Sequence, residues 1–108
     1  MSHRFDHLKV ADGDLVLVQD MSDALTAGTL VFADGATQTF TADGKTTYIE
    51  HGRPTQGEWS IVADGSFSSF WPPDYRATYN VRWIVEGAVT GLSFTQAERG
   101  DRFDGRYE

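Results

Sequence analysis

Residues 79–85 read Tyr-Asn-Val-Arg-Trp-Ile-Val. Apolar residues at positions 79, 81, 83 and 85 alternate with polar residues at positions 80 and 82, which is the two-residue period of a half-buried strand. The segment is also rich in β-branched and aromatic residues, which pack well on a pleated surface. It therefore predicts a β-strand whose apolar face carries Tyr79, Val81, Trp83 and Val85.

Tight turns separate this segment from similar ones along the chain. Glycine adopts positive φ angles without steric cost and aspartate can cap the turn backbone, so Asp-Gly between apolar runs favours a hairpin. These dipeptides are Asp12-Gly13, Asp34-Gly35, Asp43-Gly44, Asp64-Gly65 and Asp104-Gly105, with Glu86-Gly87 as a related pair. They predict strands near residues 14–19, 28–33, 36–41, 45–50, 56–63, 66–71, 76–86, 88–96 and 102–107.

The order of these segments predicts an all-β fold. Eight or nine short strands in succession favour an antiparallel up-and-down meander, and closure into a barrel would remove its exposed edges. At most one short helix is expected near residues 22–27, where Ser22 can cap a single turn and Gly28 can end it. Pro72-Pro73 cannot belong to a central strand and predicts a loop at the barrel rim.

Composition narrows the class of protein. A chain of 108 residues can bury one hydrophobic core, so residues 1–108 are expected to form a single domain with residues 1–8 as a flexible N-terminal segment. The formal net charge of −7 repels phosphate groups, so neither nucleic acid nor a membrane is expected as a partner. The chain has no cysteine, which excludes disulfides and thiolate metal sites. The polar N-terminus lacks the apolar run of a signal peptide, so a cytoplasmic location is expected.

Several glycine-containing motifs follow one another in a recognisable order. They are Leu25, Gly28-Thr29, Gly35, Asp43-Gly44 and Gly57-Glu58-Trp59, with Gly105-Arg106-Tyr107 near the end of the chain. In this order they resemble small bacterial lipocalin-like proteins of the calycin type. The resemblance implies a lipocalin-like barrel with an internal cavity, and that group includes carriers of apolar ligands and a few enzymes. A fold of this kind does not by itself determine a function.

Aromatic residues between positions 59 and 83 form the candidate ligand site. Cavities lined by aromatic rings hold apolar ligands, but a barrel of about eight strands can also fill its interior with such side chains. Arg82 either anchors a polar group of the ligand or points outward into salt bridges, because the register alone does not decide which face lies inside. The ligand hypothesis assigns the contacts to Trp59, Phe67, Trp71, Tyr79 and Trp83, with Arg82 as the anchor.

Two other classes of function remain open. An exposed aromatic strand or sheet edge could form a homodimer, and Trp71 and Tyr75 flank the proline loop where such a surface would lie. A small barrel enzyme could use His51 as a general base with Glu50 or Tyr48, although a solvated turn histidine explains the same residue.

Motifs for metals and cofactors are weak. His3 and His7 have the i, i+4 spacing of a metal-ligand pair on a helix, but they lie at a chain end. The Asp-Gly turns are spread along the chain and do not form a calcium-binding loop, and neither a phosphate-binding loop nor a zinc-protease motif occurs. No metal and no cofactor is therefore expected.

Overall fold

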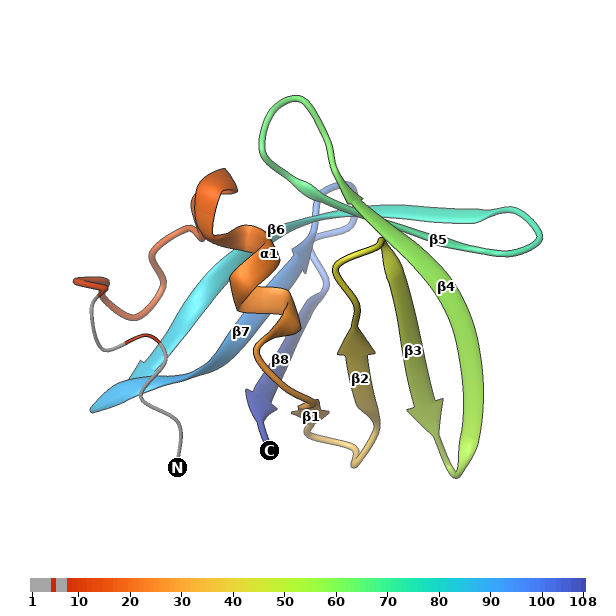
Figure 1. Cartoon of the computed structure of the whole chain (residues 1–108), viewed down its shortest axis with the longest axis horizontal. Coiled ribbons are helices and arrows are strands. Elements are labelled where there is room, and N and C mark those ends of the chain that lie inside the picture. Colours follow the sequence, from red (N-terminus) through yellow and green to blue (C-terminus); the bar gives the residue numbers. More distant parts are fainter. Residues whose placement is uncertain (1–4, 6–7) are drawn as a thin grey trace.

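The structure, a computed structural model, describes residue 5 and residues 8–108 (Figure 1). His3 and His7, the weak metal-ligand pair, lie outside the described residues, as does most of the segment 1–8 that was expected to be flexible. Phe5 packs its ring against Trp83 and Tyr107, with centroid distances of 5.1 Å and 5.9 Å.

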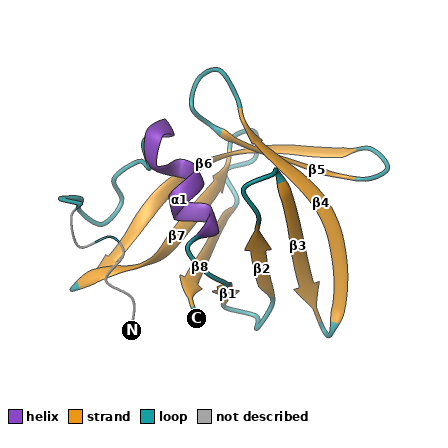
Figure 2. Cartoon of the chain, in the orientation of Figure 1, coloured by secondary structure: helices purple, strands orange, loops and turns teal. Residues whose placement is uncertain are grey.

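Within the described residues, eight strands and one helix follow one another along the chain (Figure 2). Each strand pairs antiparallel with the next, and β1 pairs with β8, so the sheet closes on itself. The predicted all-β class and the closed up-and-down barrel are confirmed. The elements are α1 (Val18–Thr26), β1 (Leu30–Phe32), β2 (Thr37–Phe40), β3 (Lys45–Glu50), β4 (Arg53–Ile61), β5 (Phe67–Trp71), β6 (Tyr75–Glu86), β7 (Ala88–Gln96) and β8 (Arg102–Tyr107).

The predicted strand at residues 14–19 is wrong. Strand β5 leaves β6 after the pair Phe67–Tyr79, and the segment before α1 covers the edge of β6 that is then free. Val16 N donates to the Val81 carbonyl oxygen at 2.9 Å, and an isolated bridge joins Leu15 to Arg82. Residues 13–16 therefore form no strand but a short edge cover, which means that they hydrogen-bond to the free edge of β6. Helix α1 then begins at Val18.

Helix α1 begins four residues earlier than the predicted turn at residues 22–27. Met21, Ala24 and Leu25 are its buried residues, and this i, i+3, i+4 spacing gives the helix one apolar face. Burial of that face stabilises a longer helix than the local capping signals indicate. A short helix ending before Gly28 was correctly predicted, but Ser22 lies inside α1 and does not cap it, because Leu17 is the N-cap residue.

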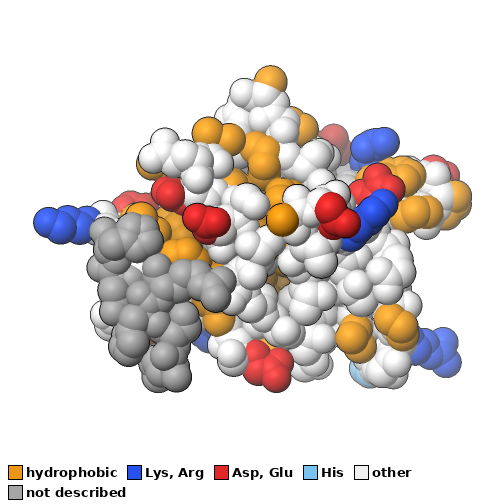
Figure 3. Space-filling view, viewed as in Figure 1, with side chains coloured by type: hydrophobic (Ala, Val, Ile, Leu, Met, Phe, Trp, Pro, Cys, Tyr) orange, Lys and Arg blue, Asp and Glu red, His pale blue; other side chains and the backbone are white. Residues whose placement is uncertain are grey.

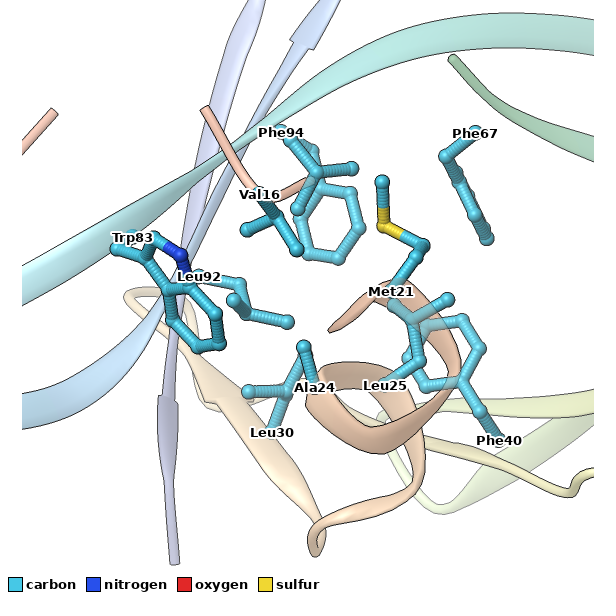
Figure 4. Packing of buried hydrophobic residues seen from close by; sticks show 11 residues of the cluster. Val16, Met21, Ala24, Leu25, Leu30, Phe40, Phe67, Trp83, Leu92 and Phe94 are labelled. Carbon is cyan, nitrogen blue, oxygen red and sulfur yellow. The ribbon is translucent and has the colours of Figure 1, made fainter. Parts of the chain in front are cut away.

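Helix α1 inserts its apolar face into the barrel and completes the core (Figure 4). Met21 and Leu25 point into the interior beside Phe40, while Ala24 lies next to Leu30. Met21, Ala24 and Leu25 are at most 1% exposed, so the barrel has no open end where the helix sits.

No helix in the described part of the chain is long and apolar enough to cross a membrane.

Not every Asp-Gly pair forms a turn. Gly13, Gly35, Gly44 and Gly65 have φ angles of 88° to 90°, as the predicted turns require. Asp104-Gly105 instead lies inside β8, where an added Cβ would stand 3.0 Å from a ring carbon of Phe32. Glycine is needed there for close packing of β1 on β8 and not for a reversal.

A two-pronged ion pair ties β8 to the end of β6. Arg106 donates from Nη2 and Nε to the two Glu86 carboxylate oxygens at 2.8 Å and 3.1 Å, and Thr90 Oγ1 donates to Glu86 Oε1 at 2.7 Å. The Arg106 guanidinium and the Thr90 hydroxyl lower the pKa of Glu86 to about 2. These contacts favour the ionised carboxylate.

The Glu86 ion pair is expected to make stability depend on pH. A carboxyl group with a lowered folded-state pKa stabilises the fold above its ordinary pKa of 4.5, and this contribution is lost as the pH falls through about 2. The melting temperature of Glu86→Gln should therefore lie below that of the natural protein at pH 7, and the difference should shrink below pH 4.5. Thermal unfolding followed by circular dichroism tests this, with Glu98→Gln as the exposed control. A difference that does not change with pH would contradict the prediction.

Candidate ligand-binding site

A pocket of about 850 Å³ occupies the end of the barrel opposite α1. In an up-and-down barrel, alternate connections lie at the same end, so the β1–β2, β3–β4, β5–β6 and β7–β8 connections surround one opening. Residues from or beside each of them line the pocket, namely Asp34, Glu50, Trp71 and Arg102. None of the described α1 residues lines it. The helix thus closes one end and the pocket opens at the other.

Aromatic rings form the deep wall of the pocket. Phe67 and Phe94 meet edge to face with their centroids 5.5 Å apart, and Tyr79 lies 6.0 Å from Phe67 and 6.3 Å from Phe94. Phe67 and Phe94 are 2% and 5% exposed, because α1 and the core support them from below. The wall is therefore preformed and apolar, which suits a planar or aliphatic ligand.

Ser69 places a hydroxyl group in this apolar wall. It lies on the same inward face of β5 as Phe67 and Trp71, and the residue is only 3% exposed. Its Oγ atom has no hydrogen-bond partner among the described residues. A buried hydroxyl without a partner costs free energy unless a bound group or water satisfies it, so Ser69 is where a polar atom of a ligand would be held.

Two phenol groups add further donors to the pocket. Burial raises the pKa of Tyr79, the nearby Tyr75 and Asp101 raise it further, and the Ser69 hydroxyl offsets part of this effect without making a well-formed hydrogen bond. Burial likewise raises the pKa of Tyr48, and the charges of Asp34 and Glu50 add to the shift. Both phenols therefore stay protonated at neutral pH and can donate to a ligand.

Gly57 gives Trp71 its place at the pocket. A Cβ added at Gly57 would stand 2.5 Å from Cε3 of Trp71 and 2.8 Å from the Phe70 carbonyl oxygen. The indole of Trp71 therefore lies directly on the Gly57 backbone, and it meets Tyr48 edge to face at 6.4 Å. Gly57 of the Gly57-Glu58-Trp59 motif therefore makes room for Trp71 and not for Trp59.

Replacing Gly57 with alanine is expected to displace Trp71 and to weaken ligand binding by about five-fold, because the added methyl group occupies the space of the indole. Titration with a fluorescent apolar ligand measures the affinity. The tryptophan emission, from which the emission of Trp71→Ala is subtracted to remove Trp59 and Trp83, measures the displacement of Trp71. The same substitution in a Trp71→Ala background is the control, since the binding effect should disappear there. An undiminished effect in that background would show that Gly57 acts by another route.

Charged side chains surround the mouth of the pocket. Arg102 pairs with Asp104 at 2.8 Å, and Arg106 pairs with Glu86. Burial raises the pKa of Asp104, but hydrogen bonds from Arg102 and Ser93 outweigh it, so the carboxyl ends below its ordinary value. Within residues 8–108, the Glu50 side chain forms no ion pair or hydrogen bond, although Arg53 lies opposite it in the β3–β4 pair. The two arginines at the mouth are thus matched by carboxylates, and Glu50 is an unmatched negative charge.

The predicted ligand contacts fall into two groups. Phe67, Trp71 and Tyr79 line the pocket. Trp59 instead packs on the core, where its indole nitrogen donates to the Thr41 carbonyl oxygen at 3.0 Å. Trp83 is 1% exposed in the core beside α1.

Arg82 lies on the outer face of β6. Its Nη1 atom donates to the carbonyl oxygen of Gly13 at 3.0 Å, so it fixes the N-terminal edge cover. Its place as a ligand anchor stays a prediction that the pocket geometry does not support.

The sequence argument missed several residues of the pocket. They are Phe32, Gln38, Tyr48, Ser69 and Phe94. The alternation of Thr46, Tyr48 and Glu50 along β3 was a usable signal, because residues two apart share the inward face. The same alternation puts Ser69 on the face of Phe67 and Trp71 and Ser68 on the other face, but Phe70 on that other face left open which side of β5 points inward.

His51 lies in the β3–β4 turn, outside the pocket. It has a φ angle of 52°, and its side chain is exposed near Glu50 and Arg53. A residue in this left-handed conformation fits the turn role that the sequence left open. Among the residues that the structure describes, no group of three His, Asp or Glu side chains is placed to hold a metal.

A smaller hollow of about 350 Å³ lies between the start of α1 and the β4–β5 connection. Figure 3 shows hydrophobic side chains at the surface near the start of α1 and near the β4–β5 connection. Leu17 and Val18 are 57% and 60% exposed there. This hollow is smaller than the pocket, and none of its described lining residues is aromatic, so it is the weaker candidate for a small ligand.

The architecture is compatible with the lipocalin-like resemblance seen in the sequence, since antiparallel strands close in chain order and leave an internal pocket. This compatibility concerns the fold alone. The chain matches no protein-family model, and no curated protein or solved structure is significantly similar to it.

Proposed function

We propose that the protein binds a small, mainly apolar molecule in the barrel pocket, with a hydrogen-bonding group of the ligand directed at Ser69. The observation that carries the proposal is a pocket of about 850 Å³ whose aromatic wall contains a buried hydroxyl without a partner in the described chain. Phe67, Trp71 and Tyr79 supply apolar contact area, as the sequence hypothesis expected. The predicted cytoplasmic location is part of the same proposal.

The volume and the lining agree with this use. Ligand pockets typically measure about 300–1,000 Å³ and combine hydrophobic walls with a few placed polar groups. The pocket has this combination, because Tyr48, Tyr79 and Ser69 stand among phenylalanine and tryptophan rings. A simple core would pair or exclude the Ser69 hydroxyl, since an unsatisfied buried polar group destabilises a fold.

The proposal is tested by titration with N-phenyl-1-naphthylamine, a neutral dye whose fluorescence rises in apolar surroundings. We expect one dye per chain with a dissociation constant of about 10 μM or tighter. Ser69→Leu fills the pocket and should weaken binding by about ten-fold or more. The matched control is Ser68→Leu, because Ser68 points to the other face of β5.

Circular dichroism of both leucine variants keeps the result interpretable. If Ser69→Leu retains the fold of the natural protein and its dye affinity, the pocket is not the binding site. Absence of dye binding to the natural protein, with no small molecule co-purifying in native mass spectrometry, would also overturn the proposal.

Homodimerisation is the second candidate, and exposed aromatic side chains near the pocket mouth favour it. Tyr75 and Phe103 are 51% and 46% exposed, and the Phe103 ring lies 6.3 Å from that of Tyr79 on the same strand as Tyr75. Trp83 takes no part, because it is buried within one chain. Light scattering decides the matter: a particle of twice the 12.0 kDa chain mass supports a dimer, and a monomer excludes it.

A further inference from the structure

Three aromatic rings at the mouth of the pocket form an open cage. Tyr48 lies between the other two, with its ring centroid 6.3 Å from Phe32 and 6.4 Å from Trp71. The Tyr48–Trp71 contact is edge to face, and all three rings line the pocket, so they border open space instead of forming a stack. Rings in such an arrangement attract a cation, because their faces carry partial negative charge.

Two carboxylates stand beside this cage. Asp34 and Glu50 both line the pocket, and both lie close enough to Tyr48 to raise the pKa of its phenol after burial has done so. Asp34 accepts a hydrogen bond from the Ala36 backbone at 3.0 Å, which holds the carboxylate in its turn without neutralising it. No ion pair of Asp34 or Glu50 is found in the described chain.

The positive charges at the mouth do not cancel these carboxylates. Arg102 is held by Asp104 and Arg106 by Glu86, in each case through two hydrogen bonds to the partner carboxylate. The lining residues comprise three carboxylates, Asp34, Glu50 and Asp104, and two arginines, so the pocket lining carries a net negative charge even before Glu86 neutralises Arg106 from the end of β6. A net negative charge beside a partly buried site attracts a cationic ligand and repels an anionic one.

We infer that the pocket selects an organic cation: an amine or quaternary ammonium group is held among Phe32, Tyr48 and Trp71 beside Asp34 and Glu50, and its apolar part fills the interior. This inference rests on the proposed function and names the ligand class for the same pocket. An independent observation points to a ligand in this space, because the Ser69 hydroxyl, in a residue 3% exposed, faces the same pocket without a partner in the described chain.

A matched set of ligands tests the charge preference. Naphthalen-1-ylmethylamine, naphthalen-1-ylmethanol and 1-naphthoate share one ring system and are cationic, neutral and anionic at pH 7. Isothermal titration at low ionic strength should show the amine binding about ten-fold more tightly than the alcohol, and the carboxylate more weakly than both. Added salt should reduce the advantage of the amine.

Two conservative substitutions locate the effect. Glu50→Gln and Asp34→Asn should each weaken binding of the amine by about three-fold more than binding of the alcohol, since each removes one charge and keeps the shape of the side chain. Asp34→Asn retains an acceptor oxygen for Ala36. Asp23→Asn, on the exposed side of α1 at the other end of the barrel, is the matched control.

The outcomes separate this inference from the proposal on which it rests. Equal affinity for the three ligands, or tighter binding of the carboxylate, overturns the choice of a cation while the pocket remains a binding site. Failure of all three ligands to bind overturns the pocket as well. An amine preference that survives both Glu50→Gln and Asp34→Asn unchanged also overturns the inference, because the preference would then arise elsewhere.

Discussion

Replacing Trp83 with alanine is expected to lower the free energy of unfolding by about 3–5 kcal/mol. Trp83 is 1% exposed and is among the largest fully buried side chains. Its ring meets Phe5 at 5.1 Å and packs in the same cluster as Leu92 and α1 (Figure 4). Truncation would leave a cavity that the surrounding strands cannot fill, since β6 is held by hydrogen bonds to β7 and to the edge cover.

Denaturant unfolding measures this loss, with Trp71→Ala as the matched control. Trp71 is only partly buried at the pocket mouth, so its truncation should cost less than half as much. For a domain of this size, about 1 kcal/mol corresponds to a change of about 4–8 °C in melting temperature. Equal losses for the two variants would contradict the assignment of Trp83 to the core and of Trp71 to the pocket.

Replacing Gly91 with alanine is expected to cost about 2–3 kcal/mol or more, and to do so without removing any contact. An added Cβ would stand 2.1 Å from the Gly105 carbonyl oxygen and 2.8 Å from the Arg106 Cα atom. Both are backbone atoms of β8, so no side-chain rotation relieves the clash. Strands β7 and β8 would have to separate at the pair Gly91–Arg106, next to the irregularity between Ile84 and Val85 of β6.

Gly28→Ala is the control for Gly91→Ala. A Cβ at Gly28 would meet its nearest atom, in the Tyr107 ring, at 4.0 Å, which is ordinary contact. Its cost should stay within about 1 kcal/mol, so thermal unfolding should separate the two variants clearly. A small effect of Gly91→Ala would mean that β7 and β8 are farther apart than described.

The ligand proposal depends on how far along the barrel axis each inward-facing tryptophan lies. Trp59, Trp71 and Trp83 all lie on inward positions of their strands, and they have three different roles. Trp83 is core beside α1, Trp59 covers the core edge with a bond to Thr41, and Trp71 borders the pocket. Substitutions at these tryptophans should therefore divide into those that change stability and those that change binding.

Local signals in the sequence determined the class of fold. The two-residue period of residues 79–85 and the positive φ angles of glycines such as Gly35 and Gly44 depend only on neighbouring residues. They therefore predicted antiparallel strands in chain order, and the proline loop between β5 and β6, without knowledge of the rest of the molecule. The same local reasoning failed for residues 14–19. Strand β5 already pairs with the first part of β6, so only a short edge of β6 was left for these residues and they form only a few hydrogen bonds.

Tertiary structure alone decided where the pocket lies and which side chains line it. A period of two places a side chain on a face but says nothing of its depth along the barrel axis, so it could not separate Trp83 from Trp71. That depth is set by β1–β8 closure and by α1, whose Met21 and Leu25 fill one end and leave the other to Ser69 and its aromatic neighbours. These contacts join residues far apart in the chain, which is why composition and spacing predicted the barrel and not its site.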